Sequence, residues 1–372
     1  MTARTIWAFF KRHAWWIIPL LIADYYLIRW LLRGPSEPEP VAESALIVSP
    51  SADPSPPPAP LYGYPTDQQD LWNTESTQVY MPTASGRIES ALFGSTRTRR
   101  FGNRFLPAFH MGIDIAPMRW DARNRPMDEI YAVRPGRVAY INRIAGNSNY
   151  GIYVVLVHDD PVGEIYTLYA HLARVPAGLA EGQAVELGQV IGVMGNTAST
   201  GLPMVRAHLH FEIGVIKNER FVSWYRTQDL PMVHGRWHGF NLVGVDPLAI
   251  YGEQGAERRF SMLDYLLELS PAFSVVVRAS RWPDYFQRYP GLWQGEPFQG
   301  DALVMTVSEA GVPLTGRNAS EDERAALGRA RAHVLEVDEE VLGRNGRRHI
   351  IRRDGRWTMG QSGERWLAIL TH

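Results

Sequence analysis

Residues 208–212 are His-Leu-His-Phe-Glu, a stretch in which polar and apolar side chains alternate. In a β-strand, residues two apart point to the same face of the sheet. His208 and His210 therefore project together, while Leu209 and Phe211 face the core. Burying two imidazoles on one strand face costs free energy unless the site uses them. This stretch predicts a strand that carries functional histidines.

A second pair of candidate residues lies upstream, in the sequence Phe-His-Met-Gly-Ile-Asp-Ile at 109–115. His110 and Asp114 are four residues apart, which alone is weak evidence for a metal site. Two histidines and one carboxylate, with a position left for water, are nevertheless typical of catalytic zinc. The chain has no cysteine, so a metal site has only His, Asp and Glu to draw on. The helical His-Glu-x-x-His pattern is absent.

Short strand-like runs surround both stretches, from about residue 87 to residue 251. Pairs such as Pro135-Gly136 and Gly195-Asn196 predict breaks between the runs. No sustained 3.6-residue periodicity appears, so the region is predicted to be mainly antiparallel β. The clearest runs are 130–133, 137–141, 151–158, 164–171, 189–193 and 208–215.

Two further motifs complete the pattern. They are Tyr-Ala-His-Leu at 169–172 and Gly-Gln-Val-Ile-Gly-Val-Met-Gly-Asn-Thr at 188–197. Together with the stretches at 109–115 and 208–212, they resemble the lysostaphin/LytM-like zinc metallopeptidases, which cut peptides in bacterial cell walls. The resemblance runs from about Phe101 to Tyr251.

The resemblance implies a role for each of five residues. His110, Asp114 and His210 are implied to bind one Zn²⁺, in an open groove of a mainly β fold. His171 and His208 are implied to be the catalytic histidines. His208 is the better candidate for the general base because it neighbours His210, but the individual roles of the two remain open. The implied substrate is peptidoglycan, in its stem peptides or its cross-links.

Other parts of this region bear on the substrate. Asn149 and Tyr150 are candidates for the groove wall, and a plain turn role is the alternative. The link Ala198–Ala207 is longer than is usual in the family, and Arg119–Met127 resembles an inserted loop. These two differences from the family bear on which substrate is preferred more than on the reaction that is catalysed. We expect structural roles for the remaining histidines of this region, His158, His234 and His238.

Composition excludes several functions. The chain has 38 basic and 39 acidic residues, and this balance argues against a nucleic-acid binder. Gly188–Gly195 lacks the Gly-Lys-Ser/Thr ending of a phosphate loop, so no nucleotide is expected. The alternative to an enzyme is a non-catalytic relative that binds the cell wall or activates another hydrolase. Such relatives are expected to have lost metal ligands, whereas all the implied residues are present here.

The first 66 residues differ from the rest. Residues 1–33 contain basic residues followed by an apolar run from Ala14 to about Leu32, long enough to approach a bilayer's thickness. We expect a membrane anchor with the remaining chain outside the cytoplasm. A cleaved signal peptide and a buried helix are the alternatives. Residues 34–66 are rich in proline and acidic residues, which predicts a disordered tether.

Residues 67–252 are then the predicted peptidase domain and residues 253–372 a small α+β domain of unknown role. In the latter, we expect helices at Phe260–Leu269 and from Ser320 to about Val334, and a strand at Ala302–Val307. Asn345-Gly346 and Asp354-Gly355 predict hairpin turns. The arginines around these turns form either a basic face for anionic wall polymers or a solvated strand face; they are residues 344, 347, 348, 352, 353 and 356.

Overall fold

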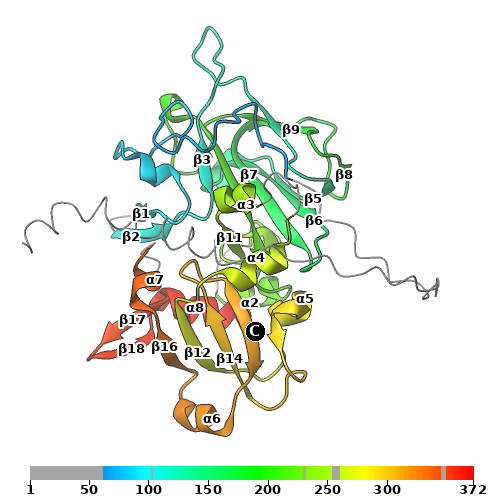
Figure 1. Ribbon diagram of the computed structural model, residues 1–372. Coiled ribbons are helices and arrows are strands. Elements are labelled where there is room, and N and C mark those ends of the chain that lie inside the picture. Colours follow the sequence, from blue (N-terminus) through cyan, green and yellow to red (C-terminus); the bar gives the residue numbers. More distant parts are fainter. Residues whose placement is uncertain (1–61, 102–103, 229–231, 254–259, 345–348) are drawn as a thin grey trace, which may run out of the picture. The chain divides into compact units, whose positions relative to one another are not determined.

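The computed structural model describes residues 62–101, 104–228, 232–253, 260–344 and 349–372 (Figure 1). These residues belong to one compact unit. The predicted anchor and nearly all of the predicted tether lie outside them. Within the described residues, no helix combines the length and the apolar character that crossing a membrane requires.

The larger sheet comprises nine strands of the described chain. Its order is β11-β10-β7-β6-β5-β8, while β3 pairs with β10, and β9 pairs with both β7 and β4. Every pairing is antiparallel, which confirms the prediction of a mainly β fold. The strands are β3 (Ile113–Ile115), β4 (Glu129–Tyr131), β5 (Gly136–Asn142), β6 (Ile152–His158), β7 (Ile165–Arg174), β8 (Ala184–Val185), β9 (Val190–Met194), β10 (Leu209–Ile216) and β11 (Leu242–Val245).

The centre of this sheet is buried on both faces. In β6, Val154 and Leu156 join the main hydrophobic cluster. The alternate residues Tyr153, Val155 and Val157 join a second cluster on the opposite face. This is why the sequence of β6 is an almost continuous apolar run rather than a polar–apolar alternation.

Strand β10 has neighbours on both sides along its length. It pairs with β3 through Leu209–Phe211 and with β11 through Ile213–Ile216. On its other side it pairs with β7. The register places His210 opposite Asp114 of β3, so two of the predicted metal ligands meet across neighbouring strands.

Smaller elements complete this region. A hairpin of β1 (Thr96–Phe101) and β2 (Arg104–Phe109) leads into His110. Two short helices, α2 (Phe221–Arg226) and α3 (Pro247–Glu253), also occur. Neither was predicted, because each is at most two turns long and too short for a 3.6-residue repeat to become visible.

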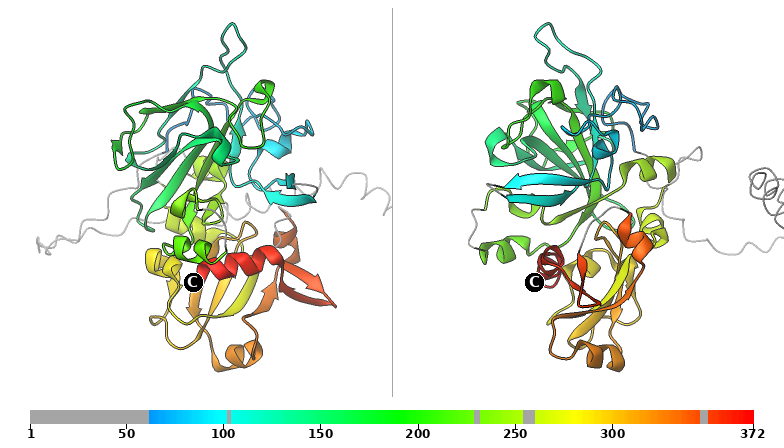
Figure 2. Two further views of the ribbon diagram at one scale, coloured as in Figure 1. Left: turned by 180° about the vertical axis from the view of Figure 1, so that it is seen from behind. Right: turned by 90° about the vertical axis from the view of Figure 1, so that its left-hand side faces the viewer.

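The C-terminal part contains a five-stranded sheet in the order β13-β15-β14-β12-β16. Helix α8 (Gln361–Leu370) lies across one face of it, where Trp366 packs near Phe273 (Figure 2). The strands are β12 (Phe273–Arg278), β13 (Trp293–Gln294), β14 (Ala302–Val307), β15 (Pro313–Asn318) and β16 (Ala332–Val337), with the hairpin β17 (Ile350–Arg353) and β18 (Arg356–Met359). The other helices are α4 (Met262–Glu268), α5 (Asp284–Arg288), α6 (Glu321–Leu327) and α7 (Glu339–Gly343).

Most predictions for this part are confirmed, and one is wrong in its extent. Helix α4 lies within the predicted range and is capped by Ser261, and α6 begins at the predicted Ser320 with a capping box. However, α6 ends at Leu327, because Gly328 adopts a positive φ of 53°. The chain then enters strand β16, where a continued helix was expected. The hairpin turn at Asp354-Gly355 is present, and the turn at Asn345-Gly346 lies outside the described residues.

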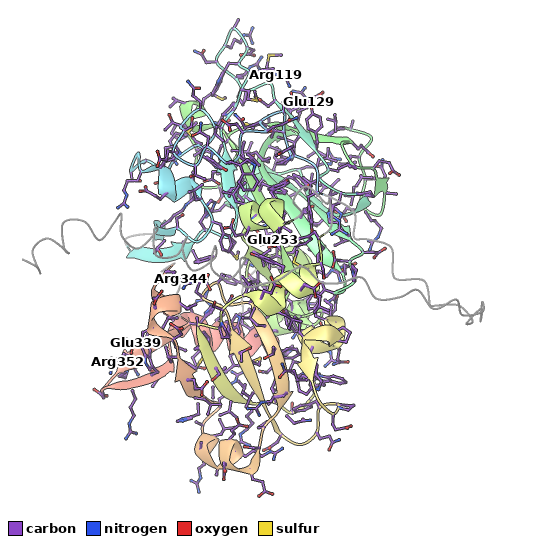
Figure 3. All side chains as sticks on the ribbon, viewed as in Figure 1. Arg119, Glu129, Glu253, Glu339, Arg344 and Arg352 are labelled. Carbon is purple, nitrogen blue, oxygen red and sulfur yellow. The ribbon has the colours of Figure 1, made fainter. Side chains whose placement is uncertain are left out.

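The predicted basic face is partly neutralised by acids. Arg344, Arg352 and Glu339 lie at the edge that carries β17 and β18 (Figure 3). Arg352 lies 3.5 Å from Glu339, and Arg344 lies 3.4 Å from Glu340. Such exposed pairs contribute little stability. They favour the interpretation of a solvated face, and the face for anionic polymers stays a prediction.

Hydrogen bonds join the end of β10 to the C-terminal elements. The amide of Ile216 donates to the hydroxyl of Tyr289 at 2.9 Å. The side chain of Asn218 donates to the carbonyl of Ile369 at 2.6 Å. Arg288 forms ion pairs with Glu164 and Glu219. The predicted domain boundary at residues 252 and 253 stays a prediction.

Candidate functional site

Three predicted ligands, His110, Asp114 and His210, converge on one point in the buried core. His110 Nε2 lies 3.0 Å from Asp114 Oδ1 and 3.0 Å from His210 Nδ1. His210 Nδ1 lies 2.9 Å from the same Asp114 oxygen. The three side chains are almost fully buried, and they form the one potential metal cluster in the part of the chain that the structure describes.

This triangle fits a zinc ion. Bonds of about 2.0 Å in a tetrahedral site place neighbouring ligand atoms about 3.3 Å apart, close to the distances observed here. The donor set of two imidazole nitrogens and one carboxylate oxygen suits zinc and leaves the fourth position free for water. In addition, the second nitrogen of each ligand histidine has its own partner. His110 Nδ1 lies 2.8 Å from the carbonyl of Leu92, and His210 Nε2 lies 2.8 Å from Glu212 Oε1.

Glu212 holds His210 from behind, a role that the sequence analysis missed. Its Oε1 also accepts a hydrogen bond from the hydroxyl of Tyr150 at 2.7 Å, and its Oε2 accepts one from Tyr166 at 2.8 Å. A carboxylate behind a ligand histidine fixes the orientation and tautomer of the ring. The two-residue spacing of His210 and Glu212 was the signal that could have revealed this role.

The two predicted catalytic histidines lie side by side next to the triangle. The ring centroids of His171 and His208 are 4.7 Å apart. His171 Nδ1 lies 2.8 Å from the carbonyl of Thr197, and His208 Nδ1 lies 2.7 Å from the carbonyl of Arg206. In each ring Nδ1 is therefore occupied, and Nε2 is the nitrogen that can act in the site. His208 Nε2 lies 3.5 Å from Asp114 Oδ1.

His171 has an unusual backbone conformation, with a φ of 60°. Its amide donates a hydrogen bond to the carbonyl of Tyr150 at 2.8 Å, which holds this conformation. Positive φ is unfavourable for residues other than glycine and is concentrated at functional sites. The backbone strain at the end of the Tyr-Ala-His motif therefore supports a functional position for this ring.

Burial controls the protonation of most of these groups. It lowers the pKa of His110 to about 4, and it lowers the pKa values of His171 and His208. Burial also lowers the pKa of His210, but the hydrogen bonds with Asp114 and Glu212 outweigh it and raise that pKa to about 9. His171 and His208 are therefore neutral near pH 7 and able to accept a proton.

Comparisons with known proteins bear on the same region. Residues 108–223 match the family model "Peptidase family M23". This part of the chain, which we call the M23 domain, thus resembles that peptidase family. The match covers the motifs of all five predicted site residues and confirms the resemblance. A search of curated proteins finds no significant match.

Several solved structures are similar to the M23 domain. A zinc-containing peptidase from Vibrio cholerae is 22% identical, over 42% of this chain and 37% of that chain, with a TM-score of 0.27. Csd3 from Helicobacter pylori is 23% identical, over 41% and 31% of the two chains, with a TM-score of 0.25. The catalytic domain of lysostaphin from Staphylococcus simulans is 18% identical, over 43% and 89%, with a TM-score of 0.27. The match thus spans about a third of the length of the first two structures.

Arg97, which precedes the matched residues 108–223, is a second residue that sequence reasoning missed. Its Nη2 lies 2.5 Å from Oδ2 of Asp114, the carboxylate oxygen that faces away from the triangle. Burial would raise the pKa of Asp114, but Arg97, together with His110 and His208, holds it well below its ordinary value. Asp114 is therefore ionised, as a metal ligand must be. Arg97 is 17 residues away in the sequence, and no local pattern links the two residues.

The two predicted groove residues have partners within the fold. The hydroxyl of Tyr150 is bonded to Glu212, so this residue supports the site. Asn149 Oδ1 accepts a hydrogen bond from Ser199 at 3.0 Å, which joins two loops. Their predicted contact with substrate, and the open groove itself, stay predictions.

Two of the histidines expected to be structural have partners that agree with that role. His158 lies between the carbonyl of Pro135 and the hydroxyl of Thr167, each at 2.8 Å. His234 contacts the hydroxyl of Tyr140 and the carbonyl of Asn147. His158 and His234 are thus held by ordinary polar groups of the fold.

Proposed function

We propose that this protein is a zinc-dependent endopeptidase that hydrolyses peptide bonds in bacterial peptidoglycan, in stem peptides or cross-links. The observation that carries the proposal is the triangle of His110, Asp114 and His210, with two neutral histidines beside it. The match of residues 108–223 to the model of peptidase family M23 supports the same reaction class. His110 Nε2, Asp114 Oδ1 and His210 Nδ1 would hold one Zn²⁺.

A bound zinc ion would supply a water of lowered pKa and polarise the carbonyl that is attacked. His208 would take the proton from that water; the proposal is supported by its Nε2, which lies 3.5 Å from Asp114 Oδ1 while its Nδ1 is held by a carbonyl. His171, beside it, would stabilise charge on the carbonyl oxygen or share the proton transfer. The same pair can deliver a proton to the leaving amine.

The outer groups keep these side chains in place. Glu212 orients His210, and Arg97 keeps Asp114 ionised. Both act through a ligand and have no contact with the substrate in this proposal. The burial of the triangle excludes bulk water, which strengthens every electrostatic interaction within it.

The test uses the purified full-length chain. Metal analysis should find one zinc per chain, and digestion of purified peptidoglycan followed by mass spectrometry should reveal fragments cut at a peptide bond. The His208→Ala protein is the control for contaminating hydrolases. Zinc without cleavage would replace the proposal with the alternative of a non-catalytic relative that binds the wall or activates another hydrolase.

We also propose that the protein acts outside the cytoplasm, anchored in the inner membrane by residues 1–33. This rests on the apolar run after Arg4, Lys11 and Arg12 and on the location of peptidoglycan. Removal of this segment as a cleaved signal would leave a secreted form.

A further inference from the structure

The segment that joins Gly195 to His208 has a defined conformation. Its two ends pair with each other as an isolated bridge. Within it, Asn196 donates to the carbonyl of Leu202 at 2.6 Å. Ser199 bonds to the neighbouring loop, through its amide to the carbonyl of Ser148 and through its hydroxyl to Asn149. The segment that leads into His208 is therefore held in place at its two ends and at Asn196 and Ser199.

Arg206 lies at the end of this segment, two residues before His208. Its backbone carbonyl holds His208 Nδ1 at 2.7 Å. The backbone of Arg206 thus already belongs to the site, whereas its side chain has no part in that contact. A substitution of the side chain leaves the carbonyl in place.

The guanidinium of Arg206 lacks a partner among the described residues. Its Nε is buried and has no hydrogen bond there, and no carboxylate lies within ion-pair distance. Arg97, Arg236 and Arg288 each pair with an acidic side chain. The guanidinium of Arg206 therefore has no acceptor of its own among the described residues and can take an acidic group from a ligand.

The charge of Arg206 acts on the metal triangle. It attracts Asp114 and repels Arg97, while partial burial lowers its pKa. Asp114 already contacts Arg97, His110 and His210, so its charge is shared among several partners. The positive charge of Arg206 therefore acts on Asp114, while no carboxylate among the described residues pairs with it.

We propose that Arg206 binds a carboxylate of the substrate next to the scissile bond and makes the enzyme select acidic peptides over amidated ones. The inference rests on the proposed peptidase function and names the substrate class of the same site. A guanidinium forms two parallel hydrogen bonds with a carboxylate, and a carboxamide cannot reproduce them. The charge-assisted bonds correspond to a preference of about 10- to 100-fold.

The test compares two peptides that are cleaved at the same bond and differ only in a free carboxylate or a carboxamide beside it. The wild type should cleave the acid with the higher kcat/KM, mainly through a lower KM. In Arg206→Gln the ratio of acid to amide should fall to near one, and Arg206→Lys should keep part of it. Zinc content should be unchanged in both variants. Arg123→Gln, at an exposed loop position, is the matched control and should keep the wild-type ratio.

A binding measurement separates this inference from the proposed function. Anisotropy of the labelled acid and amide peptides on His208→Ala protein reports selectivity without turnover. If the wild type cleaves neither peptide, the proposed function fails, while binding still decides the role of Arg206. A wild type without preference for the acid, or an Arg206→Gln protein with an unchanged preference, overturns the inference.

Discussion

The Nε2 atom of His210 lies 2.8 Å from Oε1 of Glu212, two residues further along the same strand. Both side chains thus project from one face of β10, and the carboxylate turns His210 Nδ1 toward Asp114. Three of the roughly four acceptor positions of the Glu212 carboxylate are occupied, because Tyr150 and Tyr166 also donate to it. Both the negative charge and the position of the Glu212 carboxylate therefore act on the ligand His210.

Glu212→Gln should weaken zinc binding by roughly 10- to 100-fold, as is usual when the group behind a ligand histidine is changed. Glutamine replaces one carboxylate oxygen with an NH₂ group, which faces donors either at His210 and Tyr150 or at Tyr166. Competition with a chelator of known affinity measures the effect. Glu186→Gln, in an exposed turn, is the control, and equal zinc affinity in the two variants would contradict the role given to Glu212.

His210→Ala should remove zinc and activity together, because the proposed site has only three protein ligands. Metal analysis and peptidoglycan digestion on the same preparation measure both. His333→Ala, at an exposed histidine of β16, should lose neither. A His210→Ala protein with one zinc per chain at unchanged affinity would show that the ligand assignment is wrong.

His208→Ala should keep its zinc and lose turnover by about 10²- to 10⁴-fold, the range of general-base catalysis. Three protein ligands and a water already fill a tetrahedral site, so the metal does not need His208. The loss should appear in kcat with little change in KM. His171→Ala should behave similarly, and the double variant should lose less than the sum if both act on one proton path. Loss of zinc in His208→Ala would make His208 a ligand, and full activity would make it structural.

The stability of the protein should fall in mild acid because of His158, far from the proposed ligands. Burial lowers the pKa of His158 to about 4 from an ordinary 6.5. Between these values the unfolded chain binds a proton that the folded chain does not, so stability is present above pH 6.5 and is lost as pH falls toward 4. The loss is roughly 3 kcal/mol over the window.

Urea unfolding at pH 7.5 and pH 4.5 tests this expectation. The wild type should lose about 2 to 3 kcal/mol more than His158→Gln between the two conditions, since glutamine does not titrate. His333→Gln serves as the comparison at an exposed position. An equal acid loss in wild type and His158→Gln would exclude His158 as the cause.

A reporter fused to the C-terminus should be active only outside the cytoplasm, and the protein should stay with the membrane after salt washing. Release as a soluble chain that begins near Asp24 would instead demonstrate a cleaved signal. A fusion that lacks residues 1–33 is the control and should remain in the cytoplasm.

The sequence was sufficient to predict the features that repeat locally. Six strands of the larger sheet follow from short apolar runs between turn residues, whereas β3, β8 and β11 were not predicted. The start of α6 at Ser320 was predicted as well. The five predicted site residues are brought together in the structure, while their roles as ligands and bases stay predictions.

Features that depend on tertiary contacts were beyond such reasoning. Arg97 lies near Asp114 because the pairing of β1 with β2 brings Thr96 opposite Phe109, the residue before His110. The positive φ of His171 is imposed by neighbouring loops and leaves no trace in residue type. Helix α6 ends at Gly328, although a longer helix was expected. In the sequence, an isolated glycine can either end a helix or be tolerated inside one, so Gly328 alone did not predict the end.

Because the strand register sets His210 opposite Asp114, insertions and deletions should be harmful in some parts of the M23 domain and harmless in others. One residue inserted into or deleted from β3 would turn Asp114 to the other face of the sheet. The nearby loop is different, because Trp120 and Pro126 pair and close it at its base. A foreign peptide grafted between them should leave the triangle intact, so this exposed tip offers an attachment point for labels or targeting modules.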